Sequence, residues 1–165
     1  MHKGRIVLAG GSGFLGTCLA RELEARRYEI IILSRTPGPD TDNIKRVVWD
    51  GKTLGDWAAW LKGAEAVVNL TGKSVNCRYT ARNRREIIDS RVNSVNVIAK
   101  ALLECTSPPR SWIQASSLAI YGDTGDHACD ESSSPGNGFS VDTCKRWEKS
   151  FDAADSPKPA RCCCE

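Results

Sequence analysis

The stretch LAGGSGFLG places Gly10, Gly13 and Gly16 three residues apart, after a short apolar run and at the start of an amphipathic segment. Glycines at these points permit a tight turn, let backbone N–H groups approach a pyrophosphate, and let a helix pack closely on a sheet. The stretch therefore predicts a dinucleotide-binding loop, and we include Phe14 and Leu15 in the predicted contact set. The alternative is a plain strand-to-helix turn.

The residues after the second apolar run, EIIILS, bear on which dinucleotide the loop would take. NAD-specific sites commonly have a carboxylate there to bind the ribose hydroxyls, whereas this sequence has Ser34 and Arg35. Arginine can form paired hydrogen bonds with a phosphate, so this pair favours NADP(H) over NAD(H). An exposed arginine at a strand end is the alternative. Asp50, after the third run, would either face the adenine amine or simply begin a turn.

The elements that must position these residues can be read from the apolar pattern. Short continuous runs bounded by turn residues indicate strands covered on both faces of a parallel sheet. They are RIVLAG, EIIILS, KRVVWD, AEAVVNL and SWIQAS. The apolar positions of the helices between and after them are Leu15, Leu19 and Leu23, then Ile88, Val92, Val95, Ala99 and Leu102, and finally Cys144, Trp147, Phe151 and Ala154. The alternation predicts an α/β fold: a Rossmann-like, doubly wound parallel sheet of about five strands in the order 3-2-1-4-5.

Length, charge and cysteine usage exclude several classes of protein. A chain of 165 residues is about the size of one domain. Its net charge of +3 is too small and too scattered to indicate a nucleic acid or a membrane as partner. The sequence shows no signal-peptide pattern and no membrane span, so we expect a cytoplasmic or organelle-matrix location. The single cysteines form no CxxC pair and have no histidine at metal-ligand spacing, so no metal site is predicted.

Several stretches together resemble the short-chain dehydrogenase/reductase superfamily, in its atypical extended, epimerase-like branch. They are GGSGFLG, LSR, VVNLTGKSV, REIIDSR, ASSLAIYGD and DESSSPGNGFSVDTCKRWE. Members of this group are often labelled sugar-nucleotide epimerase or cell-division-inhibitor homologue, and the resemblance covers residues 4 to about 155. It implies an NADP cofactor whose adenosine phosphate meets Ser34 and Arg35.

The same resemblance implies further cofactor contacts after the fourth strand and on the long helix. Leu70, Thr71 and Gly72 are expected to pass under the cofactor, because small residues at a strand end let a flat ring lie against the backbone. Glu86 and Arg91 are expected to border it. For Arg91, a salt bridge on the helix face is an equally good interpretation.

Reductases and epimerases of this superfamily use a tyrosine for proton transfer, a lysine four residues later that lowers the tyrosine pKa, and a serine that orients the substrate oxygen. The resemblance places the serine at Ser117, with Ser116 as a substitute. No tyrosine of the sequence has a lysine four residues later. Tyr121 is our first candidate for proton transfer and Cys144 the second. The competing interpretations are local: a turn cap for Ser117, loop packing for Tyr121, and helix packing for Cys144.

The last residues, SPKPARCCCE, depart from the resemblance, which implies another parallel strand and a substrate-binding region at this point. We expect residues 1–155 to form the NAD(P)-binding domain, residues 156–165 to be an aberrant or disordered tail, and the substrate region to be missing. A metal cluster or a prenyl anchor fits three adjacent cysteines poorly. Reading the codons one base later gives a run rich in valine or alanine, which favours a frameshift or a mispredicted exon near residue 158. The fifth strand would then be an uncovered sheet edge.

Two functions follow as hypotheses. The first is the NADP(H)-binding domain of an epimerase/dehydratase-like oxidoreductase that acts on a sugar nucleotide or a small carbonyl or hydroxyl compound, incomplete in this chain. The second is a non-catalytic, NADPH-responsive regulator or scaffold, which the missing tyrosine–lysine pair favours. The sequence does not identify the small-molecule substrate, and it leaves a homodimer open as the oligomeric state.

Overall fold

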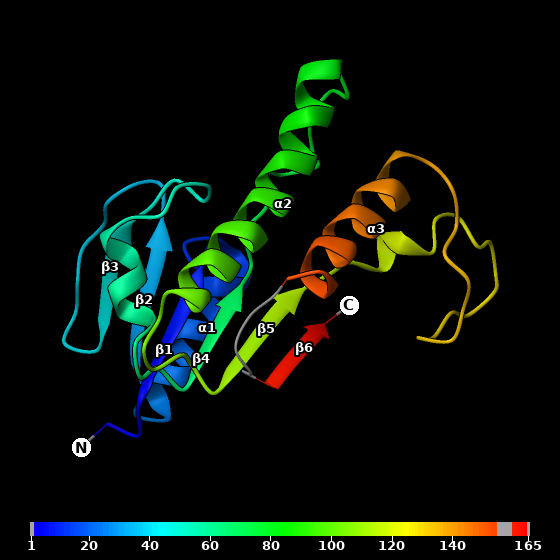
Figure 1. Cartoon of the computed structure of the whole chain (residues 1–165). Helices are drawn as coiled ribbons and strands as arrows, with labels where there is room; N and C mark the ends of the chain where they lie inside the picture. The colour runs from blue at the N-terminus through cyan, green and yellow to red at the C-terminus, as the bar shows by residue number, and fades with distance from the viewer. Residues whose placement is uncertain (1, 155–159, 165) are drawn as a thin grey trace.

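One parallel sheet organises the molecule, with six strands in the order β3-β2-β1-β4-β5-β6 (Figure 1). The computed structural model describes residues 2–154 and 160–164. The strands are β1 (Arg5–Ala9), β2 (Glu29–Ser34), β3 (Ile44–Val48), β4 (Ala66–Asn69), β5 (Ser111–Ala115) and β6 (Ala160–Cys164). The chain runs outward from β1 to β3 and then crosses to β4 on the other side of β1. In open parallel sheets, such a reversal leaves a crevice beyond the carboxyl ends of the strands.

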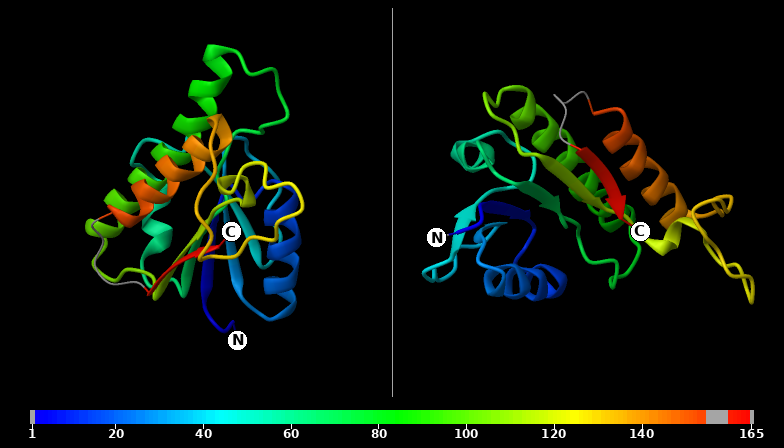
Figure 2. Two further views of the ribbon diagram at one scale, coloured as in Figure 1. Left: turned by 90° about the vertical axis from the view of Figure 1, so that its right-hand side faces the viewer. Right: turned by 90° about the horizontal axis from the view of Figure 1, so that it is seen from below.

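Helices cover both faces of this sheet, as the alternation of elements predicts. The longer ones are α1 (Phe14–Ala25), α2 (Ala81–Leu103) and α3 (Phe139–Asp152), and the 3₁₀ helices are η1 (Asp56–Leu61) and η2 (Leu118–Ile120). Figure 2 shows α1 on one face and α2 and α3 on the other. The predicted doubly wound α/β class is therefore confirmed, and the loop between η2 and α3 projects away from the sheet.

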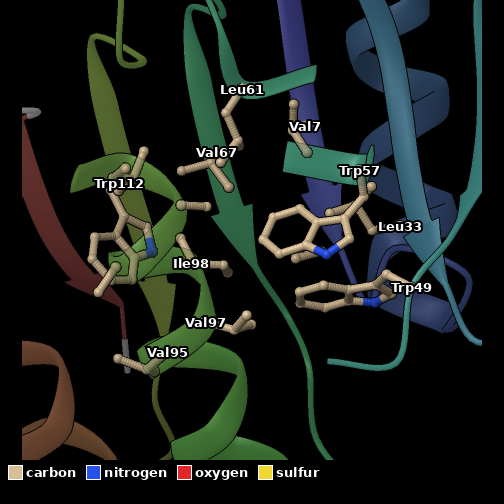
Figure 3. Packing of buried hydrophobic residues seen from close by; sticks show 14 of the residues in the cluster. Val7, Leu33, Trp49, Trp57, Leu61, Val67, Val95, Val97, Ile98 and Trp112 are labelled. Carbon is tan, nitrogen blue, oxygen red and sulfur yellow. The ribbon is translucent and has the colours of Figure 1, made fainter. Parts of the chain in front are cut away.

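The core lies on both faces because successive strand residues point in opposite directions. On β1, Val7 and Ala9 join the larger cluster, which packs under α2, α3 and η1, whereas Ile6 and Leu8 pack toward α1. Figure 3 shows this larger cluster, in which side chains from the strands meet those of α2 and two neighbouring tryptophans. Trp112 on β5 packs edge to face on a ring of α3, with 4.8 Å between ring centroids. Burial on both faces accounts for the continuous apolar runs of the central strands.

The predicted helix stripes are largely confirmed. Cys144, Trp147 and Phe151 of α3 are buried, and so are Val95, Ala99 and Leu102 of α2. The hydroxyl of Thr80 caps α2 by accepting from the N–H of Asn83 at 3.2 Å. Leu15 differs from the expectation, since 66% of it is exposed. Leu15 stands in the first turn of α1, whereas the partly buried Leu19 and Leu23 of the same helix pack against the core.

The sheet has one strand more than predicted. Residues 160–164 pair in parallel with β5, from Ser111 opposite Ala160 to Ala115 opposite Cys164. This pairing corrects the expectation of an uncovered fifth strand and, for residues 160–164, that of a disordered tail, whereas an aberrant origin of the tail stays a prediction. Backbone N–H and C=O groups on the outer edge of β5 favour a further strand, and here β6 supplies it. Cys162 and Cys163 are exposed, residues 155–159 and 165 lie outside the described residues, and the frameshift stays a prediction.

Within residues 2–154 and 160–164, no helix is both long enough and apolar enough to cross a membrane. The same residues contain no group of three or more His, Cys, Asp or Glu side chains arranged to hold a metal ion.

Candidate functional site

A cleft of about 480 Å³ opens where β1, β2 and β4 end, at the reversal of the strand order. It is lined by Gly10, Ser12, Gly13, Ser34, Arg35, Trp49, Asp50, Gly51, Lys52, Leu70, Thr71, Gly72, Lys73, Glu86, Asp89, Ser90 and Asn93. The glycine loop, the ends of β2 and β3, the turn after β4 and one face of α2 thus surround a single space. Most of the residues predicted to bind cofactor are among them.

The three glycines of the loop have different roles. Gly10 has φ of +72°, and a Cβ there would lie 2.8 Å from the Cα of Thr71, so both conformation and space require glycine. A Cβ on Gly13 would meet no heavy atom within 4 Å, which leaves this turn open toward the cleft. A Cβ on Gly16 would lie 2.4 Å from the backbone of Gly11. Gly16 therefore allows α1 to pack on the loop and does not line the cleft.

Phe14 and Leu15 also fall outside the cleft lining, because their side chains point into solvent with 82% and 66% of their surface exposed. Their contribution to the site comes from their backbone N–H groups. They begin α1, whose first N–H groups have no partners within the helix, and Gly13 at the N-cap has no side chain to satisfy them. The helix start thus presents N–H donors and a partial positive charge beside the loop.

At the end of β2, Ser34 and Arg35 both line the cleft, and their contact with a cofactor phosphate stays a prediction. The Ser34 side chain is buried, and its hydroxyl donates to the carbonyl of Thr36, which fixes the turn after the strand. The guanidinium of Arg35 is exposed and forms no ion pair with any residue the structure describes. Arg35 is thus an exposed arginine at a strand end that borders the cleft, and phosphate binding by it stays a prediction.

Asp50 lines the cleft and begins a turn. Its Oδ1 accepts from the backbone N–H groups of Lys52 at 2.9 Å and Thr53 at 2.8 Å, and its Oδ2 accepts from the Thr53 hydroxyl at 2.6 Å. The hydroxyl of Thr53 is the main cause that lowers the Asp50 pKa from 3.8 to about 2. The turn-starting role is therefore confirmed, and the contact with an adenine amine stays a prediction.

The floor of the cleft rests on buried amides that sequence reasoning missed. Asn69 ends β4, and its amide donates to the Ser94 hydroxyl at 3.0 Å and to the Gln114 Oε1 at 2.9 Å. The Asn69 Oδ1 accepts from the N–H of Thr71 at 3.1 Å, which holds the turn carrying Leu70, Thr71 and Gly72. The available signal was a polar residue near the end of each apolar run, in AVVN and SWIQ.

Thr71 itself carries an unpaired polar atom. Its Oγ1 is buried beside Gly10 and has no hydrogen-bond partner within the described part of the chain. A buried hydroxyl without a partner costs about 1–3 kcal/mol. A ligand group seated between the glycine loop and the turn after β4 would supply the missing partner.

The α2 side of the cleft carries a group of charged residues. Lys73 donates from its ammonium to Glu86 and to the Asn83 Oδ1 at 3.0 Å, and Arg82 donates to Glu86 at 2.8 Å. Hydrogen bonds from Lys73 and then Arg82 lower the Glu86 pKa to about 2. Glu86 thus lines the cleft as predicted, as a carboxylate whose charge is balanced. Ser90 and Asn93 follow Glu86 at helical spacing on the same face of α2, a periodicity that sequence reasoning did not use.

The salt bridge predicted as one interpretation of Arg91 is not found among the described residues, and its contact with the cofactor stays a prediction. Arg91 does not line the cleft. Its guanidinium donates to the carbonyls of Lys73 at 3.2 Å and Ile87 at 3.0 Å, and lies 5.1 Å from the ring centroid of Trp147. Burial lowers the Arg91 pKa from its usual value. The side chain therefore ties α2 to the turn after β4 and to α3.

The residues predicted for proton transfer lie outside the cleft lining. The Ser117 hydroxyl accepts from the N–H of Ala119 at 3.3 Å and so caps η2, as its local interpretation states. Tyr121 is only 8% exposed and packs with Ile120 and Cys144. The Cys144 thiol lies 4.0 Å from the carbonyl of Ser117. Their local roles are thus visible, and their catalytic roles stay predictions. Ser116, the substitute, donates to Glu148 on α3.

Comparison with known proteins places this geometry in a family. The profile of the NAD dependent epimerase/dehydratase family matches residues 6–141. Epimerase family protein SDR39U1 of Bos taurus is 32% identical over 149 residues, which cover 87% of this chain and 47% of that protein. Epimerase family protein YfhF of Bacillus subtilis is 31% identical over 149 residues, which cover 87% and 48%. The chain spans about half the length of these curated relatives.

Solved structures of epimerase family proteins resemble this chain in fold and in sequence. The crystal structure of human epimerase family protein SDR39U1 with NADPH matches with a TM-score of 0.78 and 30% identity, over 96% of this chain and 51% of that one. The nucleoside-diphosphate sugar epimerase from Corynebacterium glutamicum matches with a TM-score of 0.72 and 29% identity, over 92% and 31%. Since the profile matches most of the chain and the sheet has the same Rossmann-like form, the protein belongs to the NAD-dependent epimerase/dehydratase family.

Proposed function

We propose that this chain is the NADP(H)-binding domain of an epimerase/dehydratase-like oxidoreductase that acts on a sugar nucleotide or a small carbonyl or hydroxyl compound. The observation that carries the proposal is the cleft at the strand-order reversal, bordered by the glycine loop and by Arg35 after β2. This chain spans about half the length of its curated relatives, and the reaction is proposed for the protein of full family length.

The residues present fit a dinucleotide. Gly10 and Gly13 leave space above the loop, and the first N–H groups of α1 point donors toward an anion there. The buried Oγ1 of Thr71 lacks a hydrogen-bond partner in the described residues, as expected at a site built for a bound polar group. These features support a pyrophosphate against the loop, with the adenosine toward β2 and β3.

The preference for NADP(H) rests on charge. Arg35 stands at the end of β2, in the place where NAD-specific sites commonly carry an acid. Its guanidinium can donate two parallel hydrogen bonds to a 2′-phosphate, and within the described chain no carboxylate forms an ion pair with it. Human SDR39U1, which is 30% identical, was crystallised with NADPH, in agreement with this preference.

When bound, the nicotinamide cofactor would supply hydride transfer. The residues of this chain would bind and orient it: Thr71 and Gly72 beneath it, and Lys73 with Glu86 at the α2 side. The substrate class rests on family membership and on the name of the Corynebacterium relative, a nucleoside-diphosphate sugar epimerase that is 29% identical.

A second function has one observation in its favour. Ser117, Tyr121 and Cys144 do not line the cleft and are used in local bonding and packing. A cofactor-binding protein without its own proton-transfer group would act as an NADPH-responsive regulator or scaffold. Turnover of any compound in a panel of carbonyl substrates with NADPH would contradict this alternative.

The decisive experiment is a titration of the purified chain with NADPH and with NADH, followed by cofactor fluorescence. We expect saturable binding that prefers NADPH. Arg35→Asp should weaken NADPH binding about tenfold or more, because hydrogen bonds to charged groups contribute about 1.5–3 kcal/mol. It should not weaken NADH binding, because a carboxylate at this place can accept hydrogen bonds from the ribose hydroxyls.

Arg21→Asp is the matched control, because it makes the same charge change on the exposed surface of α1 away from the cleft lining. It should leave the preference intact. Equal affinity for the two cofactors would contradict the NADP(H) assignment, and a folded chain that binds neither would contradict the proposed function as a whole.

A further inference from the structure

The adenosine end of the cleft carries a second cation that sequence reasoning did not single out. Lys52 lines the cleft with Arg35, although the two residues follow different strands. Their strands are neighbours: Ser34 lies opposite Val48 in the β2–β3 register, and the N–H of Trp49 donates to the carbonyl of Ser34 at 3.0 Å. The chain therefore leaves β2 and β3 side by side and returns Lys52 to the space that Arg35 borders.

The backbone of Lys52 is held in place. Its N–H donates to the Asp50 Oδ1 at 2.9 Å, and the next N–H along the chain, that of Thr53, donates to the same oxygen. Asp50 keeps its charge in this turn, since the hydroxyl of Thr53 holds the Asp50 pKa at about 2. A lysine on a fixed turn loses less freedom on binding an anion than one on a mobile loop.

The charges at the two ends of the cleft are arranged differently. At the α2 side, the ammonium of Lys73 is paired with Glu86. At the other end, neither Arg35 nor Lys52 forms an ion pair within residues 2–154 and 160–164. Of the carboxylates that line the cleft, Glu86 and Asp89 belong to α2, and Asp50 alone follows β3, where its oxygens accept from the turn. This end therefore offers two cations to a ligand that brings negative charge.

We propose that Lys52 is a specificity-determining residue that binds the adenosine 2′-phosphate together with Arg35. The inference rests on the proposed function and adds to it: selection of the phosphorylated cofactor is shared between the ends of β2 and β3. Arg35 supplies a planar pair of donors, and Lys52 supplies a compact charge on a flexible stem from the opposite turn. NADH lacks the 2′-phosphate, so Lys52 should matter for NADPH alone.

The test uses adenosine fragments, which report on this end of the cleft without the nicotinamide. Binding of adenosine 2′,5′-bisphosphate and of adenosine 5′-monophosphate to the full chain is measured by calorimetry. Lys52→Gln should weaken bisphosphate binding about fivefold, the effect of about 1 kcal/mol for one exposed ion pair, and should change monophosphate binding less than about twofold. Lys52→Arg should retain most of the bisphosphate affinity.

Lys62→Gln is the control, since Lys62 is exposed after η1 and does not line this cleft. It should behave as the wild type, which corrects for the loss of one positive charge from the whole protein. Equal weakening of both fragments by Lys52→Gln, or no weakening of either, would overturn the inference.

The proposed function and this inference fail in different ways. If the wild type prefers NADPH through Arg35 but Lys52→Gln leaves the bisphosphate affinity unchanged, only the inference is overturned. If the folded wild-type chain binds neither NADPH nor the bisphosphate, both are overturned.

Discussion

Gly10, Arg35 and Thr71 line one cleft at the ends of β1, β2 and β4, whereas Ser117 and Tyr121, which follow β5, are engaged with their own neighbours. In the first region, the chain leaves the sheet through glycines and short polar turns. Backbone groups and the charged ends of side chains therefore face the cleft. In the second region, η2 and α3 pack against each other and use the polar side chains between them.

The difference shows what each region can contribute. Binding of a dinucleotide needs little more than a correctly shaped turn and a few donors, and the glycine-loop region supplies these by itself. Proton transfer needs a group that reaches the reacting atoms, and the groups predicted for it are here occupied in capping and packing. The residues predicted to bind the cofactor and those predicted for proton transfer therefore lie in separate regions of this chain.

The comparison predicts its largest effect at Gly16. Gly16→Ala should lower the free energy of unfolding by about 2 kcal/mol or more, because overpacking costs typically 1–3 kcal/mol and the new Cβ would meet the backbone of Gly11 at 2.4 Å. This loss should outweigh the helix propensity gained by alanine, about 1 kcal/mol. Urea unfolding followed by far-UV circular dichroism measures it.

Gly13→Ala is the matched control within the same loop. A Cβ there meets no heavy atom within 4 Å, so the loss should stay near the cost of a poorer N-cap, about 1 kcal/mol or less. Equal destabilisation by the two variants would contradict the view that Gly16 is a packing residue and that Gly13 faces open space.

A smaller effect is expected on the β5–α3 side. Ser117→Ala and Tyr121→Phe should each lower the free energy of unfolding by about 1 kcal/mol or less, the usual contribution of one hydrogen bond, and leave NADPH affinity within about twofold. Chemical unfolding and cofactor titration of the same preparations give both quantities. If a variant of normal stability bound NADPH at least tenfold more weakly, the prediction would be contradicted, and the substituted residue would have to contact the cofactor.

The smallest effect concerns pH. The Asp50 pKa is lowered from 3.8 to about 2 in the folded chain, so the fold favours the ionised carboxylate. This contribution to stability is fully present above about pH 4 and is lost as the pH falls toward 2. The difference in unfolding free energy between wild type and Asp50→Asn should therefore shrink over that range. Asp126→Asn, in the exposed loop before α3, controls for the removal of one carboxylate, and a difference that persists at pH 2 would contradict the prediction.

Much of the fold could be predicted because the central strands are buried on both faces. Continuous apolar runs such as RIVLA and EIIIL indicate that β1 and β2 are central strands. The apolar stripe of Cys144, Trp147 and Phe151 indicates which side of α3 is buried. The resemblance implied a further strand after α3, but the residues ARCCC themselves did not indicate it, since the placement of β6 depends on the outer edge of β5.

The candidate site was predictable where the backbone fixes it. Gly10, Gly13 and Arg35 are placed by the end of a strand and the turn after it, which sequence spacing encodes. The contacts of Arg91 were not predictable, because a long side chain can reach several different partners. Here its guanidinium donates to two carbonyls and lies over the ring of Trp147. Lys52 likewise reaches the cleft only through the turn that Asp50 begins.

The most direct test of the central claim is a titration of the isotope-labelled chain with NADPH, followed residue by residue through backbone amide resonances in NMR spectra. We predict that the largest shifts occur at residues 10–13, 34–35 and 70–72, where the loop and the ends of β2 and β4 meet. The account would be contradicted if saturating NADPH left these amides unchanged, or if the shifts were confined to residues 117–121 and α3.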